Sequence, residues 1–570
     1  MCCILMQTKE KLKKILKLSL DSFARNDIKI ENINEKLFKL DINIEIPAQR
    51  DYGEFSSNIS LVSAKLFKKS PRFIAENIIK YVPDFLGVCD YILKYEIAGN
   101  GFINFYMNNK FYSEILCEID KKKENYGKYE QKNKRVLIEF VSSNPTGPMH
   151  IGNARLGALG DCLSGILNFF GYEVLTEFYV NDAGNQIQKF GESLSLRYEQ
   201  IFDKNVEFIE DGYHGEDIKL LAQEFANIHG DKYIKVKSNE REKVLINYAL
   251  PRNINKIKSD LERYKIFYDS WFYESELYKN NEISNIIQKL EKNNAIYREN
   301  NAIWFKATDF GGEKDEILIR TNGIPTYFAA DIAYHVNKFV TRNFDMCINI
   351  WGADHHGHVA RMQAAMNALG INNKILKIII VQLVSVFRDG NICKMSKRSG
   401  QAETFASFLE EVNTDSARII FNMQNPGSKM VFNINEAIKN DMSNPVYYVK
   451  YAYVRLKNIV NLVDNNKKKE NFNNINLDLL NSPEERELIF ILGMFPEEIA
   501  SSSCLLDSTK ITKYLINLVS WVHKFYQFKK VRSSEINEKL SNSRLFLCKQ
   551  TIRIMEIIAN ILKIDMPEKM

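Results

Sequence analysis

Long hydrophobic runs are missing from this 570-residue sequence, and proline is scarce at 12 residues. No stretch approaches the roughly 20 apolar residues that cross a bilayer. The first residues, MCCILMQTKEKLKK, contain too short an apolar stretch for a signal peptide, and their charges lie on the wrong side of it. We therefore expect no membrane span and a cytoplasmic protein. We attribute the scarcity of proline to genome composition.

Paired cysteines are also missing. The nine cysteines are scattered, with no C-x-x-C pair and no histidine at the spacing of a zinc site. This pattern predicts no bound metal and fits a reducing compartment. The net charge excludes few kinds of partner, because +6 on so long a chain favours none in particular.

The chain divides by composition into three predicted domains, as its length leads us to expect. Helices and short strands alternate over residues 1–125, where a charged, turn-prone stretch marks the boundary. Buried strands alternate with helices over 126–430, interrupted by a long, charged, mostly helical insertion around 190–310. Amphipathic helices without strands fill residues 431–570.

A strand, a loop, a helix and a second strand open the middle domain. RVLIEFV, residues 135–141, is short, β-branched and continuous, which is typical of a parallel strand covered on both faces. This strand is followed by the loop SNPTGPMHIGNAR, a helix and a second strand, EVLTEFYV. The order predicts a right-handed βαβ unit. We expect a doubly wound parallel sheet of the Rossmann-like α/β class, with an α+β N-terminal domain and an all-α C-terminal domain. Its ligand should lie at the carboxyl ends of the strands.

The loop has the residue types of a phosphate site. Gly152 exposes bare backbone, and His150 and Asn153 belong to the first turn of the next helix, where amide protons and the helix dipole attract phosphate. On its own, such a loop is more often a helix start with incidental glycines. A second segment, CKMSKRSG, carries Lys394 and Lys397, whose ammonium groups suit the charge on a departing pyrophosphate. Alone, it would be read as a solvated basic turn.

Together, P-x-G-P-x-H-I-G-N and K-M-S-K resemble the two signature motifs of class I aminoacyl-tRNA synthetases. The resemblance implies ATP as a substrate and Mg²⁺ on its phosphates. It implies that ATP is bound by His150, Gly152, Asn153, Lys394 and Lys397. It also implies that four of these residues are catalytic: His150, Asn153, Lys394 and Lys397. No protein nucleophile is needed, because positioning and electrostatics carry most phosphoryl chemistry. The family usually has histidine where this chain has Asn153, which keeps a hydrogen-bond donor but cannot carry charge.

The resemblance narrows to arginyl-tRNA synthetases in four stretches: EFVSSNPTGPMHIGN, IPTYFAADIAYH, VQLVSVFRDGNICKMSKRSG and NPVYYVKYAYVRL. The agreement runs from about residue 51 to residue 570. It implies that L-arginine is activated with ATP to arginyl-adenylate, with release of pyrophosphate, and is then esterified to the 3′ end of tRNA(Arg). It also implies a monomer, an N-terminal domain that approaches the tRNA elbow and a C-terminal domain that binds the anticodon loop.

A guanidinium site is predicted in TYFAAD. Tyr327 and Asp331 lie four residues apart on one helical face, and Asp331 could pair with the guanidinium through two hydrogen bonds. An exposed helix pair is the alternative. The resemblance adds four further arginine contacts: Glu139, Asn144, His150 and His355. Because a site built for a planar fork rejects a mismatched ligand by about 10⁴-fold, we expect no editing domain.

Candidate RNA contacts lie in VYYVKYAYVRL. Tyr448, Tyr451 and Arg455 share a helical face that could stack on unpaired bases, although an aromatic stripe in the core is the alternative. Tyr526 is a weaker candidate for the same surface. Two other functions stay open at this level: a different class I synthetase or ATP-dependent ligase, and an RNA-binding paralogue that has lost the chemistry. Intact signature lysines argue against the paralogue, whereas Asn153 favours it.

Overall fold

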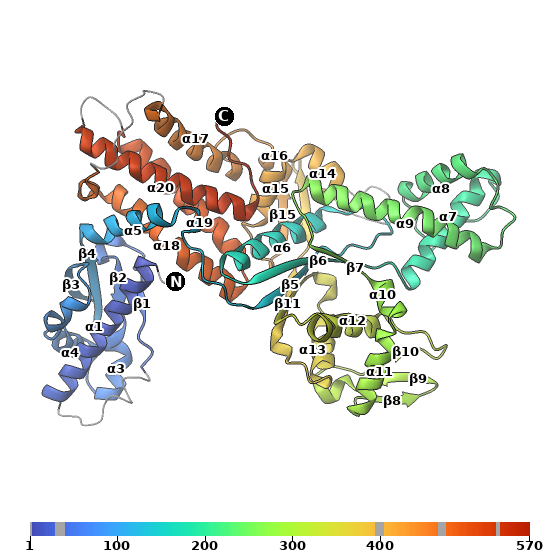
Figure 1. Ribbon diagram of the computed structural model, residues 1–570, viewed down its shortest axis with the longest axis horizontal. Helices are drawn as coiled ribbons and strands as arrows, with labels where there is room; N and C mark the ends of the chain where they lie inside the picture. The colour runs from blue at the N-terminus through green and yellow to red at the C-terminus, as the bar shows by residue number, and fades with distance from the viewer. Residues whose placement is uncertain (1–2, 29–39, 394–403, 465–474, 532–535) are drawn as a thin grey trace.

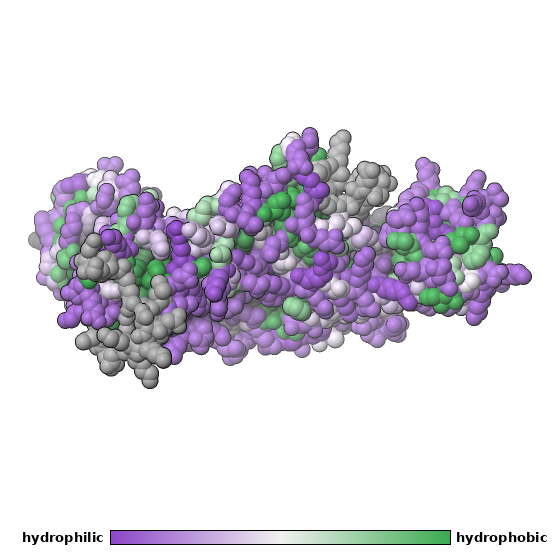
Figure 2. Space-filling view, turned by 90° about the horizontal axis from the view of Figure 1, so that it is seen from above, coloured by the Kyte–Doolittle hydropathy of each residue, from purple (hydrophilic) through white to green (hydrophobic). Residues whose placement is uncertain are grey.

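The computed structural model describes residues 3–28, 40–393, 404–464, 475–531 and 536–570. Figure 1 shows an elongated molecule, with a small α+β unit at one end, a helical bundle and a parallel sheet in the middle, and a helical lobe at the other end. The face seen in Figure 2 is largely hydrophilic, with apolar residues in small separate patches.

The N-terminal unit packs helices on one antiparallel sheet of order β1-β2-β4-β3, which confirms its predicted α+β class. In α1, Leu12, Ile15 and Leu16 recur at helical spacing and have no exposed surface, so the helix buries one apolar face. The strands are β1 (Ile44–Glu45), β2 (Phe55–Ser57), β3 (Ile92–Ala98) and β4 (Phe102–Met107). The helices are α1 (Ile4–Asn26), α3 (Ile59–Phe67), α4 (Pro71–Ile78) and α5 (Asn109–Lys122).

A five-stranded sheet of order β12-β11-β5-β6-β7 lies in the middle of the molecule, and all four strand pairs are parallel. The central strand is buried from Val136 to Phe140, as its continuous apolar sequence predicted. The predicted parallel sheet is therefore confirmed, and the carboxyl ends of its strands share one edge. The strands are β5 (Arg135–Phe140), β6 (Glu173–Val180), β7 (Ser270–Tyr273), β11 (Met346–Gly352) and β12 (Leu376–Val381).

Helix α6 (Ile151–Phe169) follows β5 and packs tightly on it. A Cβ added to Gly160 would lie 2.4 Å from the ring of Phe140. A larger residue at this position would push the helix away from the sheet. Glycine therefore sets the close approach of α6 to β5, and with it the position of the helix start beyond the strand.

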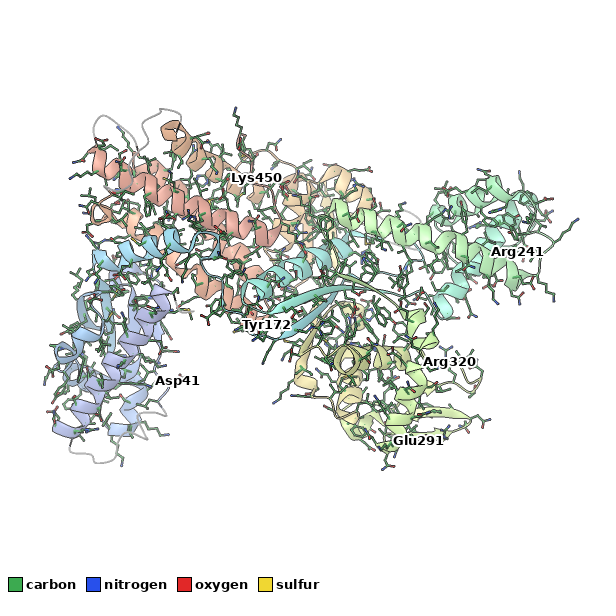
Figure 3. The ribbon with its side chains drawn as sticks, in the orientation of Figure 1. Asp41, Tyr172, Arg241, Glu291, Arg320 and Lys450 are labelled. Carbon is green, nitrogen blue, oxygen red and sulfur yellow. The ribbon has the colours of Figure 1, made fainter. Side chains whose placement is uncertain are left out.

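A helical lobe lies between β6 and β7 and has an apolar core of its own. Arg241, labelled in Figure 3, is buried at this core: its Nε donates to Ser195 Oγ at 2.8 Å, and its guanidinium lies 2.6 Å from the carboxylate of Glu199. The lobe consists of α7 (Asn185–Phe202), α8 (Glu216–His229) and α9 (Ser238–Arg263).

The helical part of the insertion is shorter than the sequence predicted. Helix was expected to about residue 310, but α9 ends at Arg263 and Ser270–Tyr273 is the edge strand of the main sheet. This strand has only four residues, SWFY, between charged segments of helical character, so local periodicity hides it. After it come α10 (Glu274–Lys279), α11 (Glu282–Lys292), an antiparallel sheet of β8 (Ile296–Glu299), β9 (Ala302–Phe305) and β10 (Glu316–Ile319), and α12 (Tyr327–Val336).

A second small sheet of order β14-β13-β15 follows β12, with β13 antiparallel to β14 and parallel to β15. Its strands are β13 (Val384–Arg388), β14 (Asn391–Cys393) and β15 (Met430–Asn433). The helices of this region are α13 (His358–Ala368), α14 (Phe405–Glu411), α15 (Thr414–Phe421) and α16 (Ile434–Ala437).

The C-terminal part is a helical bundle, as predicted. One of its helices, Pro483–Leu505, is long and apolar enough to cross a membrane by length and composition. Most of that helix is buried against α5, α6 and the neighbouring bundle helices, so it has the character of a core helix in a packed domain. The bundle consists of α17 (Pro445–Asp464), α18 (Pro483–Leu505), α19 (Thr509–Phe528) and α20 (Glu538–Leu562).

Candidate active site

The first signature loop leaves β5 with unusual backbone. Val141 and Ser142 both have positive φ, 69° and 37°, which is costly for a β-branched residue. Ser142 is held in this conformation because its Oγ donates to Glu139 Oε1 at 3.1 Å and accepts from the Tyr179 amide at 3.1 Å. The turn directs the chain across the carboxyl edge of the sheet. Asn144, a predicted arginine contact, is exposed on this loop.

His150 is the N-cap of α6, and its ring Nδ1 accepts from the Gly152 amide at 3.0 Å. A Cβ on Gly152 would lie 2.8 Å from this ring, so glycine lets the imidazole fold over the helix start. Asn153 Oδ1 accepts from the His150 amide at 2.9 Å, which completes a capping box. The asparagine that stands in place of the usual histidine therefore stabilises the helix start, and only 6% of it is exposed.

Lys394 and Lys397 lie outside the described residues. Before this segment β14 ends at Cys393, and after it Thr404 forms an antiparallel bridge with His150. The Phe405 amide donates to the Met149 carbonyl at 2.8 Å. The chain five residues beyond the second motif segment is thus hydrogen-bonded to the first motif loop.

Asp331 lies on α12 at the same edge of the sheet and is 8% exposed. Its Oδ2 is 2.8 Å from Nε2 of His358 on α13. Arg361 Nε donates to His358 Nδ1 at 2.6 Å, which fixes the orientation of the ring beside Asp331. The His358 ring therefore lies directly against the carboxylate of Asp331.

Tyr327 begins α12 and is 48% exposed. The charge of Asp331 raises its pKa well above the ordinary value, and burial and the charges of Glu274 and Glu139 act in the same direction. The phenol therefore stays protonated at neutral pH. The predicted pair of Tyr327 and Asp331 is brought together, and carboxylates surround it.

Glu274 is an acid of this pocket that sequence reasoning missed. It follows β7 directly, begins α10 and is 1% exposed. Burial and the charge of Asp331 raise its pKa to about 7, and Tyr278 donates to its Oε1 at 3.3 Å. An acid at the carboxyl end of a parallel strand is a recognisable signal. It was overlooked because this segment was interpreted as helix.

Glu139 has a different environment from the one predicted for a substrate contact. Its Oε2 is 2.6 Å from Nζ of Lys338, which has no exposed surface and also donates to Asn349 Oδ1 at 3.1 Å. The carboxylate is therefore already paired inside the protein. Lys338 was not anticipated, because it lies on a π-helical turn, Asn337–Thr341, two hundred residues further along the chain.

His355 lies at the rim, where its side chain is 45% exposed. Its ring centre is 5.9 Å from that of Trp351 and 6.5 Å from that of His358. It therefore lies beside His358, the aromatic neighbour of Asp331. Among the described residues, no group of three or more His, Cys, Asp or Glu side chains could hold a metal ion.

A second cluster of predicted residues lies far away, on the helical bundle. The Arg455 guanidinium carbon is 4.3 Å from the ring centre of Tyr451 and 4.5 Å from that of Tyr526, so α17 and α19 contribute to one stack. The ring of His523 extends it, 4.6 Å from that of Tyr448. Burial lowers the pKa of His523, and the charge of Arg455 adds to this, so the imidazole is neutral. The sequence analysis did not single out His523.

Protein-family models match successive parts of this chain. Three family models match: the arginyl-tRNA synthetase N-terminal domain over residues 9–107, the class I (R) tRNA synthetase catalytic domain over 115–465, and the DALR anticodon-binding domain over 449–570.

Relatives match along the whole chain. The arginine–tRNA ligase of Ruminiclostridium cellulolyticum is 46% identical over 536 residues, which cover 93% of this chain and 94% of that protein. That of Caldanaerobacter subterraneus is 45% identical over 569 residues, and 100% of each chain is covered. A crystal structure of a putative arginyl-tRNA synthetase from Campylobacter jejuni is 34% identical with a TM-score of 0.73, covering 81% of this chain and 100% of that one. The chain belongs to the arginyl-tRNA synthetase family, a class I aminoacyl-tRNA synthetase family.

Proposed function

We propose that Asp331, Glu274 and Tyr327 bind the guanidinium of arginine. One observation carries the proposal: two buried carboxyls converge on a tyrosine, and among the described residues neither has a lysine or arginine within ion-pair distance. Buried carboxylates without a cation are costly, and a planar guanidinium could satisfy both through charge-assisted hydrogen bonds. Lysine, with a compact ammonium, would leave acceptors unpaired.

The same edge of the sheet would place arginine beside ATP. In this proposal the amide groups at the start of α6, with His150, Gly152 and Asn153, bind the phosphates, and Lys394 and Lys397 stabilise the leaving pyrophosphate. The arginine carboxylate attacks the α-phosphate, arginyl-adenylate forms and pyrophosphate leaves. A terminal hydroxyl of tRNA(Arg) then displaces AMP. The chain thereby acts as an arginine–tRNA ligase.

Asn144 and His355 are proposed as peripheral contacts of the substrate, and Glu139 as a contact made while it stays paired with Lys338. The pocket offers carboxyls and carbonyls rather than a cluster of metal ligands. We therefore propose that Mg²⁺ binds as part of the ATP complex, where it would neutralise phosphate charge.

The stack of Tyr448, Tyr451, Arg455 and Tyr526 is proposed to bind unpaired bases of the anticodon loop. Arg455 already contacts the rings of Tyr451 and Tyr526, and the Tyr451 ring is stacked against that of His523, which is the arrangement that base stacking extends. Residues 1–125, 126–430 and 431–570 are proposed as the tRNA-elbow, catalytic and anticodon-binding domains. A monomeric, cytoplasmic protein completes the proposal.

Exchange of pyrophosphate into ATP tests the assignment, with tRNA(Arg) present and a panel of amino acids. Arginine alone should stimulate exchange, and stimulation by lysine or glutamate instead would refute the arginine site. Lys397→Ala should still bind tRNA but charge it far more slowly. Equal charging by this variant would contradict the role of the second motif.

A further inference from the structure

Arg155 lies in the second turn of α6, five residues after His150, and has no exposed surface. Its guanidinium donates to three backbone carbonyls. Nη1 reaches Gln382 at 2.9 Å and Ser428 at 3.0 Å, and Nη2 reaches Asn425 at 2.9 Å. One side chain thus joins the start of α6 to two segments that are distant in sequence.

This buried charge has no counter-ion among the described residues, because no carboxylate lies within ion-pair distance of it. Burial lowers the pKa of Arg155, and carbonyl dipoles alone compensate its charge. Such a group is expensive in an apolar interior. An apolar side chain could fill the same space at lower cost, so a structural filler does not explain an arginine here.

The three carbonyls belong to the entrances of two strands. Gln382 lies between β12 and β13, whereas Asn425 and Ser428 lead into β15. β13 and β15 pair in parallel from Val384 and Met430 onward, so Arg155 holds both strands at the point where their pairing begins. β13 continues through a hairpin into β14, which ends at Cys393, directly before Lys394 in the sequence.

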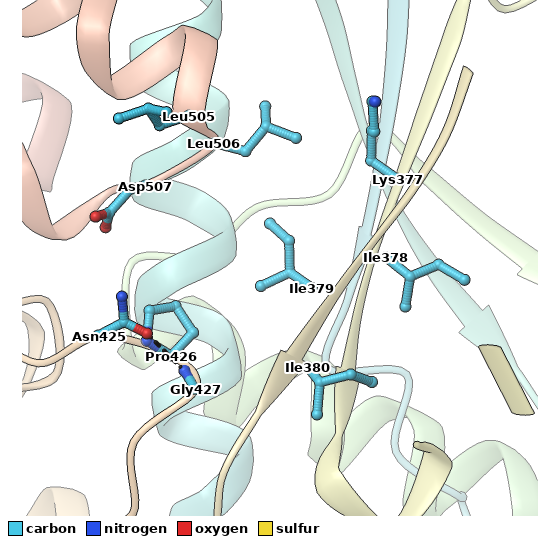
Figure 4. A pocket seen from close by; sticks show the side chains of 10 residues that line it. All are labelled: Lys377, Ile378, Ile379, Ile380, Asn425, Pro426, Gly427, Leu505, Leu506 and Asp507. Atoms are coloured by element: carbon cyan, nitrogen blue, oxygen red, sulfur yellow. Dashed lines mark hydrogen bonds between the residues drawn. The ribbon is translucent and has the colours of Figure 1, made fainter. Parts of the chain in front are cut away.

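A pocket lies beside this junction. Figure 4 shows Asn425, Pro426 and Gly427 facing Ile379 and Leu506 across a pocket of about 390 Å³. Among the described residues, two further backbone hydrogen bonds join the two segments, from the Gln382 amide to the Pro426 carbonyl at 2.9 Å and from the Met430 amide to the Leu383 carbonyl at 3.1 Å, but neither involves α6. The guanidinium of Arg155 therefore makes the hydrogen bonds between α6 and these two segments that the described residues show.

We propose that Arg155 is a positioning residue for adenylate formation: it sets the start of α6 relative to the β13–β15 sheet, and so sets the first motif relative to the strands that lead to the second. The inference rests on the proposed function of the two motifs. Arg155 does not contact arginine or tRNA in this proposal. Its loss should therefore lower kcat of pyrophosphate exchange while the KM for arginine and the affinity for tRNA stay unchanged.

Two variants test it. Arg155→Lys keeps the charge but cannot reach three carbonyls at once, and Arg155→Met keeps the volume without charge. For Arg155→Lys we expect kcat of exchange to fall about 10- to 100-fold at saturating tRNA, with the KM for arginine within about twofold of the parent. Arg155→Met should lose more. If Arg155→Met does not fold, Arg155→Lys still decides the question.

Arg418 on α15 offers a matched control. It is also a buried arginine with three acceptors, the carbonyls of Tyr264 and Leu562 and the carboxylate of Asp161 further along α6, but it joins α6 to the bundle. Arg418→Lys should lower the melting temperature yet leave kcat of exchange within about threefold. Equal losses of kcat in both variants, in proportion to their melting temperatures, would overturn the proposal. Failure of the parent protein to exchange with arginine would instead refute the proposed function.

Discussion

Two sets of acids at the carboxyl edge of the main sheet have opposite environments. Glu139 of β5 and Glu177 of β6 are buried beside Lys338 and Arg342, the latter donating to Glu177 at 3.0 Å. Burial works against ionisation of Glu177, but the hydrogen bond and charge of Arg342 hold its pKa below the ordinary value. Asp331 and Glu274 have no such cation among the described residues, and the pKa of Glu274 is raised to about 7.

This difference distinguishes acids that stabilise the fold, Glu139 and Glu177, from acids of the proposed arginine site, Asp331 and Glu274. A carboxylate that is paired inside the protein stabilises the junction between a strand and the turn that carries its partner. A buried carboxylate with no lysine or arginine beside it is costly in the empty protein and would be stabilised when a cationic ligand binds. Three substitutions probe this contrast.

Asp331→Asn should have the largest effect, on activity rather than stability. We expect kcat/KM for arginine to fall about 10³- to 10⁴-fold, because the guanidinium loses its charged partner, and discrimination against lysine to weaken. Pyrophosphate exchange with tRNA present measures both. Asp354→Asn, at a position whose side chain is 78% exposed on the rim, is the control and should stay within about threefold. A similar loss in both variants would contradict the contrast.

Glu139→Gln should act mainly on stability. It leaves the ammonium of Lys338 buried without its carboxylate, so the free energy of unfolding should fall by about 3–5 kcal/mol in urea titrations. The double variant Glu139→Gln/Lys338→Met removes the stranded charge and should recover most of the loss. An additive loss in the double variant would show that the pair is not coupled.

Glu274→Gln should have the smallest and most pH-dependent effect on stability. The native carboxyl keeps its proton up to about pH 7, whereas the unfolded one loses it near 4.5, so the parent is destabilised as pH rises between these values. The variant should therefore gain up to about 3 kcal/mol relative to the parent at pH 8, and little at pH 4.5.

Arginine binding gives the opposite sign at the same residue. In the parent, the KM for arginine should improve as pH rises through about 7, because the ionised carboxylate binds the guanidinium. Glu274→Gln should bind arginine more weakly and lose this dependence. Glu276→Gln, on the exposed side of α10, should change neither melting temperature nor KM with pH. If the KM of the parent for arginine does not change with pH, the proposal that Glu274 binds the guanidinium as a carboxylate is contradicted.

The sequence was sufficient where the signal is local. The strand at 135–140, the glycine-rich loop, the helix after it and the helical face of Tyr327 and Asp331 all follow from short-range patterns, and they lie where expected. The short strand at 270–273 was not predicted, because four residues are too few to show a periodicity. Glu274 was missed with it, since its significance depends on the strand that precedes it.

By itself, the sequence determined the parallel-sheet class and the family through its two signature motifs, and it predicted residues for a phosphate and a guanidinium. Only the tertiary structure decided which acids are neutralised, that Asn153 and His150 cap the same helix, and that Arg155 joins segments over two hundred residues apart. The physical reason is that pairing of charges depends on distance in space. Partners such as Lys338 and Arg342 reach the sheet from elements whose position the local sequence does not encode.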